Sequence, residues 1–262
     1  MRFFSIVPSD ANSEAGIMPD PSIFADMAKL AEEGFRNGTL LAQDGVKPSA
    51  EGARVKFDAG KVRVVDGPFA ESKELVAGWA ILRFPTLDAA IAEAKRLPMK
   101  CEIEIRQIVE AEDLGADPAS EAAMRAAMPP VAPGMHRYVL FLKSSPEAES
   151  GAMPSNDIIE AMNRYNAELV AAKAMLGGEG FHGTAKGARV DLATGKVTKG
   201  PFGDPRKVLA GYWMIQAASL ADAIAWAKKA PIKDGEIEVR TVFELADFPA
   251  EASRHFAQHT AH

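Results

Sequence analysis

The chain shows the same succession of apolar patterns twice. Residues 2–7 and 137–142 are runs of β-branched and aromatic residues, which are typical of strands. Apolar positions then recur at steps of four, three and four residues, which indicates a helix buried along one face. These positions are Ile23, Met27, Leu30 and Gly34 in the first half, and Ile158, Met162, Tyr165 and Leu169 in the second. Asn37-Gly38 predicts the end of the first helix.

The rest of each half repeats a pattern of strands, a helix and a final strand. Short strands are predicted around 55–57 and 62–65, and a long apolar strand over 76–84 and again over 208–216. A second helix should begin at Thr86 or Ser219, whose hydroxyls can cap a first turn. Strict alternation over 102–106 predicts the last strand. The order β-α-β-β-α-β is that of the ferredoxin-like split unit.

The two halves are copies of one unit. Gly52-Ala53-Arg54-Val55 recurs at 187–190 and Gly67-Pro68-Phe69 at 200–202, and about a third of the aligned positions are identical. We therefore expect a first copy over 1–110, an alanine- and proline-rich linker over 111–135, a second copy over 136–248 and a tail over 249–262. One helix is expected in the linker, over 119–128.

The sheet of each copy needs a cover on both faces. The segments 3–7 and 79–82 are apolar at consecutive positions, so both faces of these strands avoid water. The two helices of a unit cover only one face, and the nearest cover for the other is the sheet of the second copy. The predicted fold class is therefore α+β, with tandem ferredoxin-like units forming an intramolecular pseudo-dimeric α+β barrel.

Composition narrows the classes of partner. Hydrophobic residues make up 47% and charged residues 25% of the 262 residues, as in ordinary globular chains. Cys101 is the single cysteine, so an internal disulfide is excluded. The net charge of −6 argues against a nucleic-acid partner. The apolar run 75–82 is far shorter than the ~18 residues of a membrane span, and the start is too short for a signal peptide. We expect a cytoplasmic protein with neither nucleic acid nor membrane as partner.

The segment 66–74, Asp-Gly-Pro-Phe-Ala-Glu-Ser-Lys-Glu, resembles the motif of the DGPF-domain branch of the YCII-related family. In that family the motif is followed by a glycine–aromatic strand, here Gly78-Trp79, by a helix with a trailing proline, here Pro98, and by a closing E-x-R strand, here Glu104 and Arg106. The glycine-rich segment 177–180 also matches. The resemblance covers about 220 residues, nearly all of both copies, and implies the dimeric α+β barrel superfamily.

What the resemblance implies about function is limited. Most members have no established activity, and some resemble partners of extracytoplasmic-function sigma factors. YCII relatives are suspected enzymes with a His–Asp pair whose histidine lies near the start of the first helix. The corresponding segments here, 20–23 and 155–158, contain no histidine, so that chemistry does not carry over.

Asp66 is the candidate catalytic residue. A carboxylate beside a tight Gly-Pro turn at a strand end can act as a general base. The alternative is that Asp66 caps its own turn, which is common for Asp before Gly. The second copy has Lys199 at this position, so the two copies cannot share one acid–base role.

The candidate ligand-binding residues are charged or aromatic, and most of them recur in both copies. Alternation places the acidic and basic residues of each last strand opposite its apolar residues, toward the other sheet. They can line a polar pocket between the sheets or form an internal ion-pair network. Turn residues can clamp an anion at the mouth of such a pocket or be solvated. The set is Arg54, Phe69, Lys73, Glu104, Arg106, His182, Arg189, Phe202, Glu238 and Arg240.

No cofactor or metal is expected. The G-x-G-x-x-G at 178–183 follows a helix and precedes a strand, the reverse of the dinucleotide-binding context. His182 within it is a lone loop histidine that aligns with Lys47. His255 and His259 have helical spacing but no further ligands. The sequence thus favours a protein that binds a small molecule, with or without cofactor-free acid–base catalysis such as isomerisation, cyclisation or hydrolysis. The alternative is a non-catalytic regulatory or interaction module linked to sigma-factor-dependent transcription.

Overall fold

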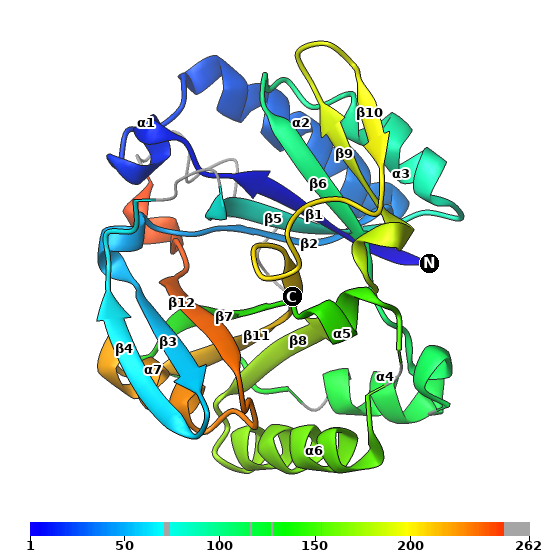
Figure 1. Cartoon of the computed structure of the whole chain (residues 1–262). Coiled ribbons are helices and arrows are strands. Elements are labelled where there is room, and N and C mark those ends of the chain that lie inside the picture. The colour runs from blue at the N-terminus through cyan, green and yellow to red at the C-terminus, as the bar shows by residue number, and fades with distance from the viewer. Residues whose placement is uncertain (71–73, 116, 127, 153, 249–262) are drawn as a thin grey trace.

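A computed structural model describes residues 1–248 except 71–73, 116, 127 and 153. Two six-stranded antiparallel sheets face each other, with strand orders β10-β9-β6-β1-β5-β2 and β4-β3-β12-β7-β11-β8. Helices lie on the outer faces, α2 and α3 on the first sheet and α6 and α7 on the second (Figure 1). The predicted α+β class with two sheets packed inside one chain is confirmed.

The elements follow the same order in each copy. The first copy comprises β1 Arg2–Pro8, α1 Ala11–Glu14, α2 Pro21–Asn37, β2 Leu40–Gly45, β3 Ala53–Asp58, β4 Lys61–Asp66, β5 Val76–Arg83, α3 Leu87–Ala94 and β6 Glu102–Gln107. Helix α4, Pro118–Ala126, follows. The second copy comprises β7 His136–Lys143, α5 Pro146–Glu149, α6 Asn156–Ala171, β8 Met175–Gly180, β9 Gly187–Asp191, β10 Val197–Lys199, β11 Leu209–Ala217, α7 Leu220–Lys228 and β12 Gly235–Thr241.

The helix ends follow the capping signals of the sequence. Gly38 ends α2 with a φ of 74°, a left-handed conformation that glycine adopts without strain. The hydroxyl of Thr86 accepts a hydrogen bond from the amide of Ala89 and begins α3. Ser219 does the same for α7 through the amide of Asp222. Both predicted starts of the second helix are confirmed.

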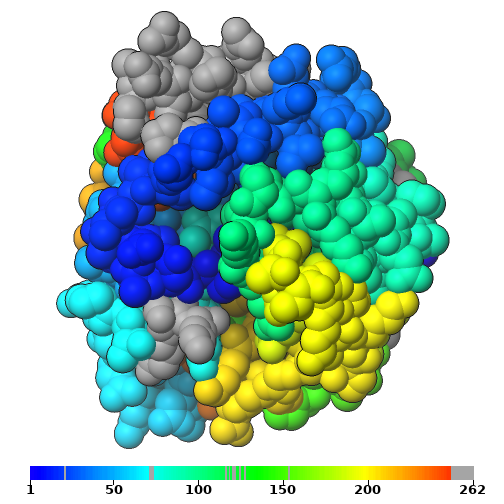
Figure 2. Space-filling model, turned by 90° about the horizontal axis from the view of Figure 1, so that it is seen from above, coloured from blue at the N-terminus to red at the C-terminus, as the bar shows by residue number. Residues whose placement is uncertain are grey.

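The two copies exchange a hairpin, which the sequence did not predict. The hairpin β3–β4 of the first copy joins the sheet of the second, where Val55 pairs with Ile237 of β12. The hairpin β9–β10 joins the sheet of the first copy, where Val190 pairs with Ile103 of β6. Figure 1 shows each hairpin beside the other copy's last strand, and Figure 2 shows the yellow hairpin β9–β10 against green residues of the first copy.

The exchange corrects the strand order within each unit. Residues 55–57 and 62–65 form strands, but not the middle strands of their own βαββαβ unit. Those are β2 and β8, which pair with β5 and β11. Both lie in segments that look poor for a strand: β8 reads Met-Leu-Gly-Gly-Glu-Gly, and β2 ends in Gln-Asp-Gly. Glycine and aspartate are depleted in strands, so the pattern gave no signal.

The sheets close into a barrel whose interior is filled. Isolated bridges Val46–Val242 and Ile108–Phe181 join the two sheets at opposite corners. An apolar cluster occupies the space between the sheets, with the rings of Phe4, Trp79 and Tyr212 at its centre. Two further clusters lie under the helices on the outer faces. The cover that apolar strands such as β1 require is thus supplied by the second sheet.

In the part of the chain that the structure describes, no helix combines the length and the apolar character needed to cross a membrane.

Candidate functional site

The last strand of each copy carries two charged residues into a buried network. On β6, Ile103 and Ile105 pack under the helices, and Glu104 and Arg106 lie on the opposite face, as alternation predicted. The side chain of Arg106 is fully buried. On β12, Glu238 and Arg240 are the equivalent pair and are almost fully buried as well. Buried charges are costly unless they are paired, so we expect each of these side chains to have a partner of opposite charge.

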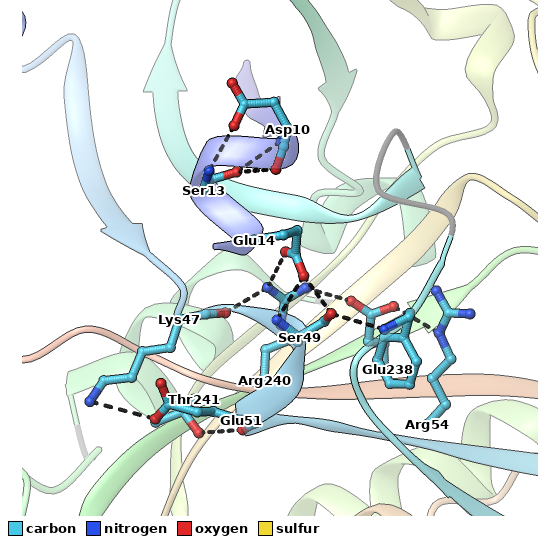
Figure 3. A network of polar contacts seen from close by, with 11 residues as sticks. Asp10, Ser13, Glu14, Lys47, Ser49, Glu51, Arg54, Glu238, Arg240 and Thr241 are labelled. Atoms are coloured by element: carbon cyan, nitrogen blue, oxygen red, sulfur yellow. Dashed lines mark hydrogen bonds and ion pairs between the residues drawn. The ribbon is translucent and has the colours of Figure 1, made fainter. Parts of the chain in front are cut away.

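Arg240 is paired on two sides. Its Nη1 donates to Oε1 of Glu238 at 2.9 Å. Its Nη2 donates to the carbonyl oxygen of Lys47 at 2.6 Å and to Oε1 of Glu14 at 3.3 Å. Figure 3 shows Arg240 between Glu14, from α1, and Glu238. A guanidinium from the second copy is therefore neutralised by a carboxylate from each copy.

Arg54 extends this network from the exchanged hairpin. Its Nε lies 3.2 Å from Oε2 of Glu238 and 3.3 Å from Oε1 of Glu236. Its guanidinium carbon lies 4.0 Å from the centre of the Phe69 ring, a cation–π arrangement. Four residues of the predicted set, Arg54, Phe69, Glu238 and Arg240, therefore belong to one network.

Glu14 and Ser49 complete this network, and neither was among the residues predicted from the sequence. Oε2 of Glu14 accepts hydrogen bonds from the amide and the hydroxyl of Ser49. The Ser49 oxygen accepts in turn from the amide of Phe69, at 3.1 Å. Burial raises the pKa of Glu14, but the hydrogen bonds from Ser49 and the charge of Arg240 outweigh it and hold that pKa below its usual value. Glu14 therefore stays ionised.

An equivalent network surrounds Arg106. Its Nη1 donates to Glu104 at 3.1 Å, and its Nη2 donates to Oε1 of Glu149 at 3.1 Å and to the carbonyl oxygen of His182 at 2.7 Å. The Nε and Nη2 of Arg189 each donate to Oε2 of Glu104 at 3.1 Å. Four further residues of the predicted set therefore belong to this second network: Glu104, Arg106, His182 and Arg189.

The hairpin and turn of the second copy complete the Arg106 network. Arg189 stacks on the ring of Phe202 at 4.5 Å. The amide of Thr184 donates to Oε2 of Glu149 at 2.7 Å, and its hydroxyl oxygen accepts from the amide of Phe202 at 3.2 Å. Burial raises the pKa of Glu149, but the hydrogen bonds from Thr184 and Ser144 and the charge of Arg106 hold it below its usual value.

Each network is built from both copies. The first takes its last-strand pair from β12 of the second copy and its hairpin, turn and α1 carboxylate from the first. The second network reverses these roles, with β6 from the first copy and α5 from the second. The hairpin exchange is what brings the two sets together, so neither network can form within a single copy.

The glycine–proline turns fix where the aromatic rings lie. A Cβ at Gly67 would stand 1.8 Å from the carbonyl oxygen of Ser49, and one at Gly200 would stand 1.7 Å from that of Thr184. Only glycine permits this approach of two backbones. The close approach brings Phe69 and Phe202 within hydrogen-bonding distance of Ser49 and Thr184.

Asp66 stands apart from both networks. It is exposed at the end of β4 and pairs with Ala53 in the strand ladder. Within the described residues its carboxylate has no ion-pair partner. Its counterpart Lys199 is exposed and lies 2.7 Å from Asp88. Lys73 lies outside the described residues. The catalytic role of Asp66 therefore stays a prediction.

His182 contributes its backbone to the network and its ring to a neighbouring contact with Asp113. The carbonyl oxygen accepts from Arg106, while Nε2 lies 3.0 Å from Oδ2 of Asp113. Lys47 has the equivalent place in the first network. Its carbonyl oxygen accepts from Arg240, and its Nζ lies 2.7 Å from Asp247. Among the residues the structure describes, no group of three or more His, Cys, Asp or Glu side chains is placed to hold a metal ion. His255 and His259 lie outside those residues.

A surface hollow of about 350 Å³ adjoins the second network. It is lined by Glu149, Thr184, Pro201, Phe202, Gly203 and Pro205. Gly203 has a φ of 80°, and a Cβ there would stand 3.3 Å from Arg189. The volume falls in the lower part of the range for small-molecule sites.

The space between the sheets contains ion pairs that the sequence did not reveal. Nη1 of Arg137 lies 2.8 Å from Oδ1 of Asp44, and Nη1 of Arg2 lies 2.7 Å from Oε1 of Glu179. Burial raises the pKa of Asp44 to about 6, although Arg137 acts in the opposite sense. Burial also raises the pKa of Tyr212, at the centre of the cluster. These pairs join the edge of one sheet to the opposite sheet.

Comparisons with known proteins agree with the repeat. A family model described as the YCII-related domain matches residues 1–112 and again residues 136–246. The chain is 30% identical over 78 residues to "Uncharacterized protein R00369" of Rhizobium meliloti (strain 1021). That match covers 30% of this chain and 63% of the relative. A solved structure, "Crystal structure of Putative Chlorite dismutase TA0507", is 12% identical with a TM-score of 0.38, over 98% of each chain.

Proposed function

This chain belongs to the YCII-related family, in two tandem copies, and we propose that it is a small-molecule-binding protein whose site is the hollow beside Phe202. The observation that carries the proposal is the hollow itself. It is concave, of ligand size, and adjoins a buried network that holds its walls in place. Rigid support of this kind reduces the ordering cost of binding.

The lining suggests which ligand chemistry fits. Glu149 is the charged residue of the lining and stays ionised, because hydrogen bonds and Arg106 stabilise its carboxylate. The ring of Phe202 and the rings of Pro201 and Pro205 supply apolar surface. A carboxylate beside an aromatic ring favours a ligand with an ammonium or hydroxyl group on a compact apolar body.

A regulatory or interaction module is the second candidate. The observation that favours it is the filled space between the sheets, where the rings of Phe4, Trp79 and Tyr212 pack against one another. Acid–base catalysis is a weaker proposal, because Asp66 is exposed and lies outside the lining of the hollow.

A fragment screen with a matched pair of variants tests the proposal. A set of small amines and alcohols on ring scaffolds is screened against the full chain by thermal shift, and hits are confirmed by calorimetry. Phe202→Leu should weaken binding of a hit roughly fivefold, the effect of losing an aromatic contact of about 1 kcal/mol. Phe69→Leu is the control, because Phe69 has the same place in the first network.

Two outcomes would overturn the proposal. One is a hit whose affinity falls equally in both variants, which would indicate a general loss of structure. The other is a complete absence of hits while the folded chain retains a specific macromolecular partner, which would favour the module instead.

A further inference from the structure

The second network contains a row of four charges that alternate in sign. Arg106 donates to Glu149 and to Glu104, each at 3.1 Å. Arg189 donates to the other oxygen of Glu104, also at 3.1 Å. The two central residues of the row therefore each face two charges of opposite sign. Glu149 is the negative end of the row and Arg189 the positive end.

Both ends of this row border the hollow beside Phe202. Glu149 and Gly203 are lining residues. A Cβ at Gly203 would stand 3.3 Å from Nη2 of Arg189, so the guanidinium lies directly behind a residue that has no side chain. Arg189 also stacks on the ring of Phe202, a further lining residue. The hollow thus has a carboxylate in its wall and a guanidinium at its border.

The positive end is more exposed than the equivalent arginine of the first network. The side chain of Arg189 is 31% exposed, and that of Arg54 is 11% exposed. Arg54 faces a second carboxylate, that of Glu236, at 3.3 Å. The counterpart of Glu236 is Glu102, which is exposed and makes no ion pair with Arg189 in the described part of the chain. Nε and Nη2 of Arg189 donate to Glu104, so the two donors of Nη1 are not used by that carboxylate.

We propose that this hollow binds the zwitterion of a small amino acid. The ammonium group contacts Glu149, the carboxylate accepts from Arg189, and the apolar side chain packs beside Phe202. Each end of the row then gains a second charge of opposite sign. A guanidinium suits a carboxylate, because it can offer two parallel hydrogen bonds. The volume of about 350 Å³ suits a compact ligand. This inference rests on the proposed function, since it names the ligand class of the same hollow.

Calorimetric titration of the natural full chain tests the two charged contacts without a variant. The probes are glycine, L-alanine, L-valine and L-leucine near neutral pH. Each is compared with its amide, which keeps the ammonium group but has no carboxylate, and with the carboxylic acid that lacks the amino group. At least one amino acid should bind. Its amide and its deaminated acid should each bind roughly tenfold more weakly, the effect of losing one charge-assisted contact.

A matched pair of variants locates the carboxylate contact. Arg189→Gln removes the guanidinium at the hollow, so the amino acid and its amide should bind with similar affinity. Arg54→Gln makes the same change in the first network, which does not line the hollow, and should leave the preference for the amino acid intact. Circular dichroism confirms that each variant is folded. The comparison of amino acid with amide in the natural protein decides the question if either variant does not fold.

The possible results separate this inference from the proposed function. Amides or simple amines that bind at least as tightly as the amino acids would overturn the inference and leave the proposed function standing. A chain that binds none of the amino acids, amides and ring fragments would overturn both. An Arg189→Gln variant that is folded and keeps the full preference for the carboxylate would also overturn the inference.

Discussion

Glu14 and Arg240 stand near opposite ends of the chain, yet Oε1 of Glu14 lies 3.3 Å from Nη2 of Arg240. The pair joins α1 of the first copy to the last strand of the second. Glu149 and Arg106 make the same contact with the copies reversed, at 3.1 Å. These buried pairs each join a short helix of one copy to the last strand of the other, so they link the two copies at two separate places.

Removal of one partner from such a pair should be strongly destabilising. Arg240→Met leaves the carboxylates of Glu238 and Glu14 without their shared cation, and Glu238 is almost fully buried. Loss of one member of a buried pair costs about 3–5 kcal/mol of unfolding free energy. Urea denaturation followed by circular dichroism measures the change. Arg164→Met is the control, because the Arg164–Glu160 pair is exposed and should shift the midpoint little. Equal losses in both variants would contradict a special role for the buried pair.

The glycine of the Gly-Pro-Phe turn should tolerate no side chain. Gly67→Ala places a Cβ against the carbonyl oxygen of Ser49, and separation of the two backbone segments would strain the hydrogen bond from the amide of Phe69 to the Ser49 hydroxyl. We expect a loss of roughly 2–3 kcal/mol of unfolding free energy. Gly177→Ala is the matched control, since the nearest atom to its added Cβ is 3.9 Å away. Thermal melts of both variants measure the change. A Gly67→Ala variant as stable as the natural protein would show that the turn can adopt another backbone conformation.

The barrel could be predicted from the sequence because its apolar positions are periodic and the whole pattern occurs twice. The apolar faces of 3–7 and 79–82 require a second cover, and the duplication supplies one, so the packing of two sheets follows from the pattern. The hairpin exchange does not follow from it. A segment such as 53–58 has the same alternation whether it pairs with the last strand of its own copy or of the other. The choice depends on the path of the connecting loops, which leaves no trace in the local pattern.

The candidate site was predicted only in part, for a similar reason. Arg54, Glu238 and Arg240 stand out because charge at an inward-facing strand position is unusual. Glu14 and Ser49 sit in a short helix and a loop, where charged and hydroxyl residues are ordinary. Asp44 was missed because β2 was not predicted. Without a predicted strand, alternation cannot indicate that the side chain of a polar residue such as Asp44 faces inward.

The exchange predicts that the two copies stay together after the linker is cut. A protease site inserted between Gly134 and Met135, an exposed position between the copies, allows cleavage of the folded chain. Because each copy contributes a hairpin to the other's sheet, the fragments should co-elute in size-exclusion chromatography and separate only in denaturant. Fragments that separate in native buffer would contradict the exchanged pairing.

The raised pKa of Asp44 predicts a distinctive pH dependence of stability. The pKa of this carboxyl is about 6 in the folded protein and near 3.8 when unfolded. Between these values the folded state binds more protons than the unfolded state, so the contribution of Asp44 to stability falls as pH rises from about 4 to about 6 and is constant above that range.

Asp44→Asn lacks this ionisation. The unfolding free energy of Asp44→Asn should therefore increase relative to the natural protein across this interval, in urea titrations at several pH values. Loss of the contact with Arg137 adds an offset that does not depend on pH over this range, since Arg137 keeps Glu244 as a partner at 3.0 Å. A difference that stays flat from pH 4 to pH 7 would show that Asp44 titrates normally.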